Sequence, residues 1–292
     1  MTNDSLAKLG DITKPATVLI EKISDAVGGI FRPHQIVRVA KEEAEAAFIE
    51  AESQIRITGL QRRAMSRFLE EEAKRQSNME AVTLKVLPLL EEDSKPQNVA
   101  DDWITNFFEK SRIVSDGQMQ QIWARILAGE ANATDTFAKQ TVNLLADLDK
   151  GDAEQFARLC GFCWKIEALF LLVFDINGEI YNRAGVNFPL FSNLESLGLI
   201  RIEPIIGFVQ QKLPQIVSAS YFNRTTQLTF PAEKDNTLKL GSVLLTRAGR
   251  QLAPICGSTP VDGFFEYVYD SWAGQSLVPM RQTERVAPTE MP

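Results

Sequence analysis

Histidine is nearly absent from this chain: His34 is the one histidine among 292 residues. Histidine acts as the general base in most catalytic triads and is the commonest side-chain ligand of protein-bound metals. The sequence therefore excludes a His-based triad and a multi-histidine metal site. A glycine-rich phosphate loop and a G-x-S-x-G nucleophile motif are also missing, which removes two common signatures of nucleotide-binding proteins and hydrolases.

Cysteine is scarce as well. Cys160, Cys163 and Cys256 are too few for a disulfide framework and are typical of a reducing cytosol. The run "CGFC" from Cys160 to Cys163 has the spacing of a thiol–disulfide motif, but we expect it inside a helix that has already begun at Asp152, far from the helix end that lowers a thiol pKa. The sequence favours two core cysteines, with a redox role as the alternative. No zinc-ligand spacing joins His34 or Cys256 to the pair.

An excess of positive charge and long apolar runs are also missing. The formal net charge is -7, and neither half of the chain carries more Lys and Arg than Asp and Glu, so binding to a phosphate backbone is not expected. The longest apolar run, Ile166 to Phe174, is far shorter than the ~20 residues that span a bilayer. Asp4 stands where a signal peptide needs an apolar run. We therefore expect a cytoplasmic protein without a membrane span.

What the chain does contain is helix-forming sequence, with 45% hydrophobic residues, enough to bury a sizeable core. Residues 15–31 predict a short amphipathic helix. Residues 34–76 are rich in Ala, Glu, Arg and Gln and lack proline, which predicts a long charged helical stem with one weak joint at Thr58–Gly59. A further helix is predicted from Met79 to Leu90, where Pro88 distorts or ends it.

The later segments predict a helical core followed by a small antiparallel sheet. Helices are expected over "DDWITNFFEKSRIV" and "SDGQMQQIWARILAGE". Beyond Gly178, the helix in "FPLFSNLESLG", strands between about residues 199 and 246, and the helix "RAGRQLAPIC" follow the winged-helix order. The predicted fold is mainly α with a small antiparallel β part. Its predicted segments are an N-terminal helix and stem over 1–94, a helical core over 95–178, a winged-helix-like domain over 179–275 and a disordered tail over 276–292.

A stripe of charged residues runs along the predicted stem. At 100° per residue its members fall within about 60° of one another. The opposite side is rich in alanine and offers little apolar surface, so we expect the stem to pack against another stem, in a second copy of the chain or in a partner protein. The predicted interaction residues are Glu45, Glu52, Arg56, Arg63, Arg67 and Lys74.

A winged helix raises the question of DNA binding, which the sequence does not favour. The recognition helix would lie between Val186 and Ile200, where there is no Lys or Arg and a single acid, Glu195. Contacts from Arg and Lys to base edges and phosphates carry much of DNA recognition. We expect this helix to serve protein contacts or the packing of its own domain, and a DNA-binding regulator stays as an alternative.

Carboxylates offer another alternative, a metal-dependent nuclease or phosphohydrolase-like effector. Most of these acids stand where helix caps and first-turn acids belong, which favours a structural role. The sequence therefore predicts no catalytic residue, no metal and no cofactor. The carboxylates concerned are Asp101, Asp102, Asp147, Asp149 and Asp152.

One long run, together with two later pieces, resembles a known group of sequences. The run "DDWITNFFEKSRIVSDGQMQQIWARILAGEANATDTFAKQTVNLLADLDKGDAEQF", followed by "LESLGLI" and "LLTRAGRQLAPICG", resembles an uncharacterised bacterial family, a domain of unknown function. That family is distantly similar to the abortive-infection alpha proteins, which share the "SD..MQ.IWA.ILAGE" helix and the later "LGLI... LT..G" pair. The resemblance covers about residues 10–272. It implies a role in the defence of a bacterial cell against phage and supplies no catalytic residues, so we expect a non-enzymatic interaction or sensor protein.

Overall fold

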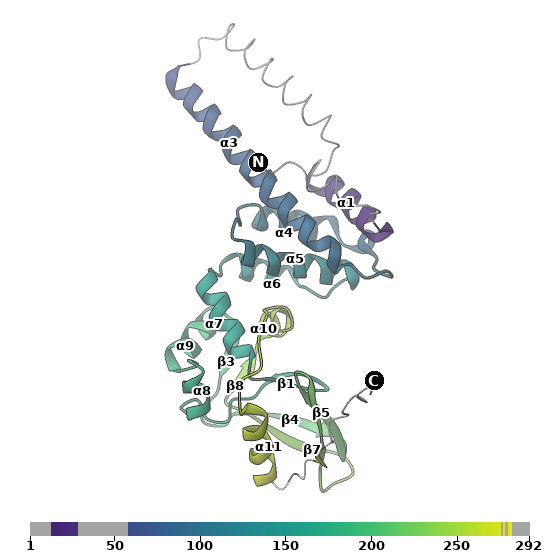
Figure 1. Ribbon diagram of the computed structural model, residues 1–292, viewed down its shortest axis with the longest axis vertical. Coiled ribbons are helices and arrows are strands. Elements are labelled where there is room, and N and C mark those ends of the chain that lie inside the picture. The colour runs from purple at the N-terminus through teal and green to yellow at the C-terminus, as the bar shows by residue number, and fades with distance from the viewer. Residues whose placement is uncertain (1–12, 29–57, 276, 278–279, 282–292) are drawn as a thin grey trace, which may run out of the picture. The chain divides into compact units, whose positions relative to one another are not determined.

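The computed structural model describes residues 13–28, 58–275, 277 and 280–281 (Figure 1). The chain divides into two compact units, Met1–Ala146 and Asp147–Pro292, which we call the helical unit and the mixed unit. All described strands belong to the mixed unit. The fold is mainly α with a small antiparallel β part, as the sequence predicts. The division after Ala146 differs from the predicted boundaries at 94 and 178, because the end of the stem packs with the helices that follow it.

The first described helix, α1, spans Lys14–Val27 and confirms the predicted amphipathic segment. Its buried residues, Ala16, Leu19 and Ile23, recur at a spacing of three to four and pack against α4. The helix ends at Gly28, which has a φ of +81°, a conformation that glycine adopts without steric cost.

The stem extends further toward the C-terminus than predicted, and a helix begins at its predicted joint. Helix α3 spans Gly59–Val86, so it runs through the expected break between Gln76 and Met79 and joins two predicted helices. Its start is fixed by a capping box, in which the Thr58 side chain accepts from the Gln61 amide and the Gln61 side chain accepts from the Thr58 amide. Thr58 has extended backbone angles, with ψ at 154°, so one helix does not continue across the predicted joint. The stem residues 36–57 lie outside the described residues.

The remaining helices of the helical unit are α4 (Asp101–Ser111), α5 (Gly117–Asn132) and α6 (Lys139–Ala146). Two short 3-10 helices, η1 (Leu87–Leu89) and η2 (Pro96–Asn98), connect α3 to α4. The C-terminal half of α3 packs on α4 and α5. An aromatic cluster with ring centroids 5.1–5.4 Å apart lies on α4 and contacts α5 through the edge-on pair of Phe107 and Trp123. These rings belong to Trp103, Phe107, Phe108 and Trp123.

A buried carboxylate shapes the connection between α5 and α6. The Glu130 side chain is 4% exposed, and its two oxygens accept hydrogen bonds from the amides of Asp135 and Phe137, both at 2.8 Å. The Trp103 indole N–H donates to the carbonyl of Phe137 at 2.8 Å. Asp135 holds a positive φ of 66°, which a non-glycine residue adopts only where its surroundings enforce it. Glu130 therefore organises this loop.

The mixed unit opens with α7 (Lys150–Cys160), which ends earlier than the sequence predicts. Gly161 caps the helix, and Cys163 is the first residue of strand β1 (Cys163–Ile166). The prediction that the whole "CGFC" run lies inside a helix is therefore wrong. Local helical periodicity continued through this segment, but pairing with β2 (Ala168–Leu171) and with β5 (Ile216–Tyr221) draws it into a sheet.

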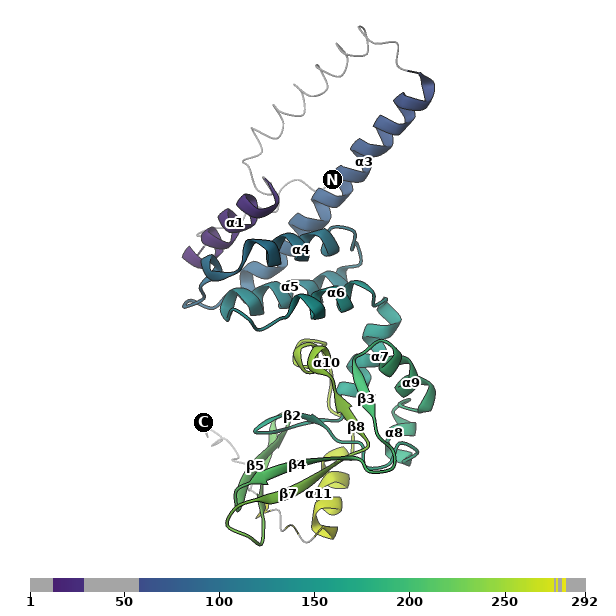
Figure 2. The ribbon, with the colours of Figure 1, turned by 180° about the vertical axis from the view of Figure 1, so that it is seen from behind.

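Three sheets share the strands of the mixed unit. A five-stranded sheet has the order β2-β1-β5-β6-β9, with β6 at Arg224–Thr229 and β9 at Met280–Arg281. Strands β4 (Phe208–Leu213) and β7 (Asn236–Gly241) form a second, antiparallel sheet. The third sheet pairs β3 (Ile200–Ile202) with β8 (Val243–Leu245). Strands are thus present in the predicted range of about residues 199–246, but they belong to three separate sheets (Figure 2).

The third sheet is held between two helices. Helix α9 (Phe188–Ser196) leads through Gly198 into β3, and β8 leads through Thr246 into α10 (Arg247–Leu252). The Thr246 hydroxyl donates to the carbonyl of Gly198 at 2.7 Å, and the Thr246 amide donates to the carbonyl of Leu199 at 3.0 Å. These contacts explain why "LGLI" and "LT..G" stand as a pair in the sequence.

The last helix, α11 (Phe264–Gly274), covers part of the five-stranded sheet through aromatic contacts. The Trp164 ring on β1 lies 4.9 Å from the Trp272 ring and 5.2 Å from the Phe265 ring, both on α11. The Arg224 guanidinium also lies over the Phe265 ring, 3.6 Å from its centroid. Helix α8 (Glu179–Arg183) completes the unit.

Candidate interaction surface

The N-terminal half of α3 is the most exposed regular element in the described chain. Every residue from Thr58 to Glu71 is exposed, and burial begins only near Asn78. Figure 1 shows this half of the helix extending past α4 and α5. Helical segments of this length are marginal in water without packing on one face. We call residues 58–75 the α3 arm.

The α3 arm carries large apolar side chains in addition to its charges. At 100° per residue, Leu60, Ala64, Phe68 and Met65 fall within an arc of about 140°. Leu69 lies next to this arc. The four largest of these side chains, Leu60, Met65, Phe68 and Leu69, are 44–69% exposed. The sequence predicted little apolar surface on the stem, and the exposed Leu60 and Phe68 side chains were not part of that prediction.

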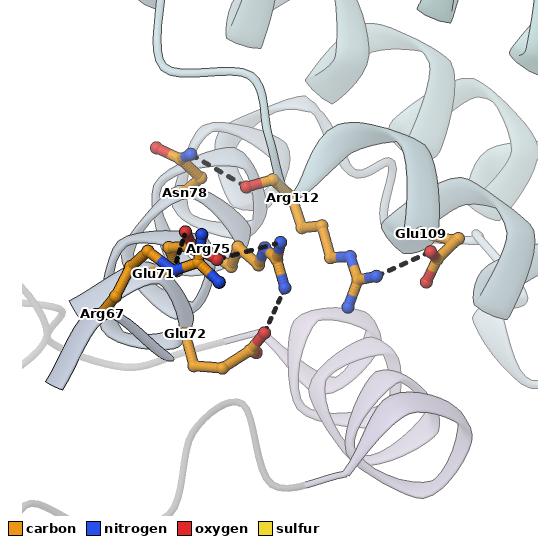
Figure 3. A network of polar contacts seen from close by, with 7 residues as sticks. All are labelled: Arg67, Glu71, Glu72, Arg75, Asn78, Glu109 and Arg112. Carbon is orange, nitrogen blue, oxygen red and sulfur yellow. Dashed lines mark hydrogen bonds and ion pairs between the residues drawn. The ribbon is translucent and has the colours of Figure 1, made fainter. Parts of the chain in front are cut away.

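The ion pairs of the α3 arm (Figure 3) begin near one edge of this apolar arc and continue past Leu69 toward the C-terminal end of the arm. Arg67 Nε lies 3.6 Å from Glu71 Oε1, and Arg75 Nη2 lies 3.8 Å from Glu71 Oε2. Arg75 also pairs with Glu72. Such (i, i+3) and (i, i+4) pairs contribute about 0.3–0.5 kcal/mol each to a helix. They support the arm, yet they leave its apolar residues exposed.

The arm is anchored to the helical unit at its C-terminal end. The buried Asn78 amide donates to the carbonyl of Arg112, at the end of α4, over 2.9 Å (Figure 3). Arg112 Nη2 in turn lies 2.6 Å from Glu109 Oε1. Further along, Lys85 Nζ donates to Gln120 Oε1 on α5 at 2.9 Å. These contacts fix the direction in which the arm leaves the unit.

The six predicted interaction residues fall into two groups. Arg63, Arg67 and Lys74 lie on the exposed arm. Glu45, Glu52 and Arg56 lie outside the described residues. Because α3 begins at Gly59, the described part of the stripe is confined to the arm.

Four of the five carboxylates of the metal-site alternative have structural partners. Asp101 pairs with Lys22 on α1, and Asp102 pairs with Lys139 on α6, an ion pair that lowers the pKa of the Asp102 carboxyl. Asp149 and Asp152 form the capping box of α7, as first-turn acids do.

Asp152 Oδ1 also accepts from the Asn193 amide at 2.9 Å. Within the described residues, no three His, Cys, Asp or Glu side chains are grouped so as to hold a metal ion.

Helix α9 uses its polar side chains on its own surroundings. Asn187 caps the helix by accepting from the Leu190 amide, and Ser196 donates to the carbonyl of Asn193 at 2.7 Å. Glu195 Oε1 accepts from the Ile202 amide at 2.7 Å. Asn193 donates to residues of α7. The helix offers a nucleic acid no cation and few uncommitted donors.

We therefore expect no sequence-specific DNA binding by the full chain. Only weak association with duplex DNA is expected, because α9 contributes no Lys or Arg and the net charge is -7, and this association disappears as salt rises. The measurement is a gel-shift selection from random duplexes at physiological salt, with an unrelated duplex as competitor. Recovery of a defined sequence motif contradicts the expectation.

A pocket of about 480 Å³ lies between α7 and α9 within the mixed unit. Its wall includes Arg158, whose guanidinium lies close to Gly185, and the acid Glu154. The remaining lining is neutral, and Asn193 is already bonded to α7. The lining residues are Gly151, Glu154, Gln155, Arg158, Gly185, Asn187, Pro189, Leu190 and Asn193.

The three cysteines are brought together, which the sequence did not predict. The side chains of Cys163 and Cys256 both neighbour Cys160 and, together with burial, raise the pKa of its thiol. Cys160 and Cys163 are buried, as the core interpretation predicts, and Cys256 is half-buried. All three are free thiols. Sequence spacing could not show this, because 96 positions separate Cys160 from Cys256.

Comparison with known proteins gives one match. The model of a family described as protein of unknown function (DUF2806) matches residues 62–269. No curated protein and no solved structure matches the chain. The predicted place in an uncharacterised family is confirmed, whereas the similarity to abortive-infection proteins stays a prediction. Among the described helices, none is long and apolar enough to cross a bilayer.

Proposed function

Because the chain belongs to the DUF2806 family, whose function is unknown, we propose from its own residues that it is a non-enzymatic interaction protein that self-associates through the α3 arm. The observation that carries the proposal is the exposure of Leu60, Met65, Phe68 and Leu69 on an arm that no other described element covers. Burying a large apolar side chain contributes about 1.5–3 kcal/mol.

The occupant that we propose for the arm is a second copy of it, in antiparallel orientation. Arg67 and Glu71 stand on the same edge of the apolar arc. In an antiparallel pair the same edges of both helices meet, so Arg67 of one copy lies beside Glu71 of the other, and the reverse holds across the two-fold axis. With the axis near Phe68, the Phe68 and Leu69 side chains of both copies pack at the centre.

The arm composition supports this orientation. The basic residues Arg62, Arg63 and Arg67 are followed by the acids Glu70, Glu71 and Glu72, and Lys74 and Arg75 stand at the end of the arm. A parallel pair sets like charges side by side, which is unfavourable. An antiparallel pair brings the arginines that end at Arg67 toward the acids Glu70, Glu71 and Glu72 of the other copy.

The test is the mass of the full chain in solution. We expect about twice the chain mass of 32.6 kDa at micromolar concentration by light scattering or sedimentation. Phe68→Glu should raise the dissociation constant at least about tenfold, because it places two charges at the centre of a symmetric interface. Ile206→Glu, a change at an 86% exposed position in the mixed unit, is the matched control and should leave the mass unchanged. A monomeric wild-type chain contradicts the proposal.

A mixing experiment tests the orientation. Arg67→Glu and Glu71→Arg each create like-charge contacts in their own dimer. Mixed dimers of the two variants contain only opposite-charge contacts between copies, so they should form in preference to either homodimer, as native mass spectrometry can measure. Equal amounts of mixed and unmixed dimers would exclude this pairing of residues 67 and 71.

We also propose that β3, β8, α9 and α10 form a winged-helix-like module that serves packing and protein contacts. The support is the helix–strand–strand–helix order around Thr246 and the absence of Lys and Arg on α9. The setting that we propose, defence of a bacterial cell against phage, rests on the resemblance of the "SDGQMQQIWARILAGE" segment to abortive-infection alpha proteins. Plaque assays on cells that carry the Phe68→Glu and Ile206→Glu variants connect this setting to self-association.

A further inference from the structure

The cysteine cluster lies at a junction of the mixed unit that is held in place by other contacts. Gly161, directly after Cys160, lies so close to the segment after α10 that an added Cβ would be 2.7 Å from the carbonyl oxygen of Thr259. The end of α7 and residues 256–261 are therefore in direct contact. Figure 2 shows α7 and α10 near one another in this unit.

A tyrosine fastens the same junction. The Tyr221 hydroxyl donates to the carbonyl of Gly161 at 2.8 Å and accepts from the Val261 amide at 2.6 Å. Burial raises the pKa of Tyr221 to about 12, so the hydroxyl stays protonated and keeps donating at neutral pH. The two chain segments that carry Cys160 and Cys256 are thus held at short range.

The thiols differ in exposure and in their surroundings. Cys160 is 1% exposed, and burial raises its pKa, so it stays a thiol. Cys256 is half-buried, and its sulfur lies 3.1 Å from the carbonyl of Ala253. A hydrogen bond from the Cys160 thiol, aided by the Ser258 amide, lowers the pKa of Cys256. A thiolate is the nucleophilic form of cysteine, so Cys256 is the more reactive of the two.

We propose that Cys256 and Cys160 form a hydroperoxide-sensitive thiol pair that closes into a disulfide. The Cys256 thiolate attacks one oxygen of hydrogen peroxide, and after protonation a sulfenic acid and one water result. The Cys160 sulfur then attacks the sulfenic sulfur, the Cys160 proton leaves with the hydroxyl group as a second water, and the S–S bond forms. Two thiols are oxidised and one peroxide is reduced. The bond ties the end of α7 to the segment after α10.

Cys163 is assigned no part in this reaction. It lies on β1 and is only 7% exposed. The three sulfurs are also not grouped as a metal site among the described residues. The structure thus provides one accessible sulfur, Cys256, with a buried thiol beside it.

The experiment treats the full chain with a small excess of hydrogen peroxide, then denatures it in an alkylating agent and maps the products by mass spectrometry. The wild type should lose about 2 Da before alkylation, and its alkylated cysteines should fall from three to one. Cys163→Ser should form the same disulfide. Cys160→Ser should accumulate a sulfenic acid on Cys256 that dimedone captures, and Cys256→Ser should keep both remaining thiols reduced.

Each contrary result overturns the proposal. A mapped bond between Cys160 and Cys163, three alkylated cysteines after peroxide, or disulfide formation in Cys256→Ser would each do so. Circular dichroism of the three serine variants establishes that they are folded. If Cys160→Ser does not fold, the wild-type peptide map and Cys163→Ser still decide which sulfurs are joined. Self-association through the α3 arm is measured separately, so the two proposals fail independently.

Discussion

Replacing Gly249 with alanine is expected to lower the free energy of unfolding of the mixed unit by about 3 kcal/mol or more, at the upper end of overpacking effects. A Cβ on Gly249 would lie 2.1 Å from the carbonyl oxygen of Leu199 and 3.3 Å from Leu245 Cδ2. An oxygen of the backbone moves less easily than the end of a side chain. This one also accepts hydrogen bonds from the amide and hydroxyl of Thr246.

Relief of the clash would separate α10 from the turn that enters β3. That movement stretches the Thr246 contacts and the pairing of Ile200 with Leu245. The higher helix propensity of alanine returns only about 1 kcal/mol. The destabilisation caused by the clash is therefore expected to exceed the gain in helix propensity.

Hydrogen exchange measured on peptides of the mixed unit gives the free energy of its opening separately from that of the helical unit. Gly274→Ala is the matched control, since Gly274 is also helical and an added Cβ meets nothing within 4 Å. The control should be neutral or slightly stabilising. A Gly249→Ala protein that is as stable as the control would show that β3 and α10 are not in close contact.

Glu130→Ala is expected to destabilise the helical unit by about 2–4 kcal/mol. The change leaves the amides of Asp135 and Phe137 without their acceptor, and hydrogen bonds to a charged group contribute about 1.5–3 kcal/mol each. Both bonds are 2.8 Å long, and the carboxylate is buried. The loop also loses the support for the positive φ of Asp135. Glu130→Gln retains one acceptor oxygen and should fall between the wild type and the alanine variant.

The control is Glu109→Ala, which removes a carboxylate that is 58% exposed and pairs with Arg112. Exposed ion pairs contribute about 0.2–1 kcal/mol. Urea unfolding followed by exchange of peptides from α5 and α6 compares the two. Equal losses at positions 109 and 130 would mean that the buried carboxylate does not hold the loop.

Several features could be predicted from the sequence because they depend on local patterns. The apolar spacing of α1, α4 and α5 follows from one buried face per helix, and the acids at the starts of α4 and α7 follow from unpaired amides. The scarcity of histidine excludes His-based catalytic triads and multi-histidine metal sites from the sequence alone. Membership of an uncharacterised family could be predicted from runs of residues. One of these runs, "IWARILAGE", includes Glu130.

The candidate surfaces could be predicted only in part. Arg63, Arg67 and Lys74 were placed on the stem by periodicity, and the structure puts them on an exposed arm. Phe68 was missed because its exposure depends on where α4 and α5 stop covering α3. The pairing of Cys256 with Cys160 was missed as well, since its spacing matches no thiol or metal motif.

The sequence by itself thus determined that the protein is mainly helical and which faces of its helices are buried. It also excluded His-based catalytic triads and multi-histidine metal sites. Only the tertiary structure decided that the "CGFC" run divides between α7 and β1, that the predicted strands belong to three sheets, and that three distant thiols meet. The physical reason is that helix periodicity and capping depend on residues within about four positions of one another. Strand pairing and side-chain clusters depend on free energies shared between segments far apart in the chain, and no local pattern records them.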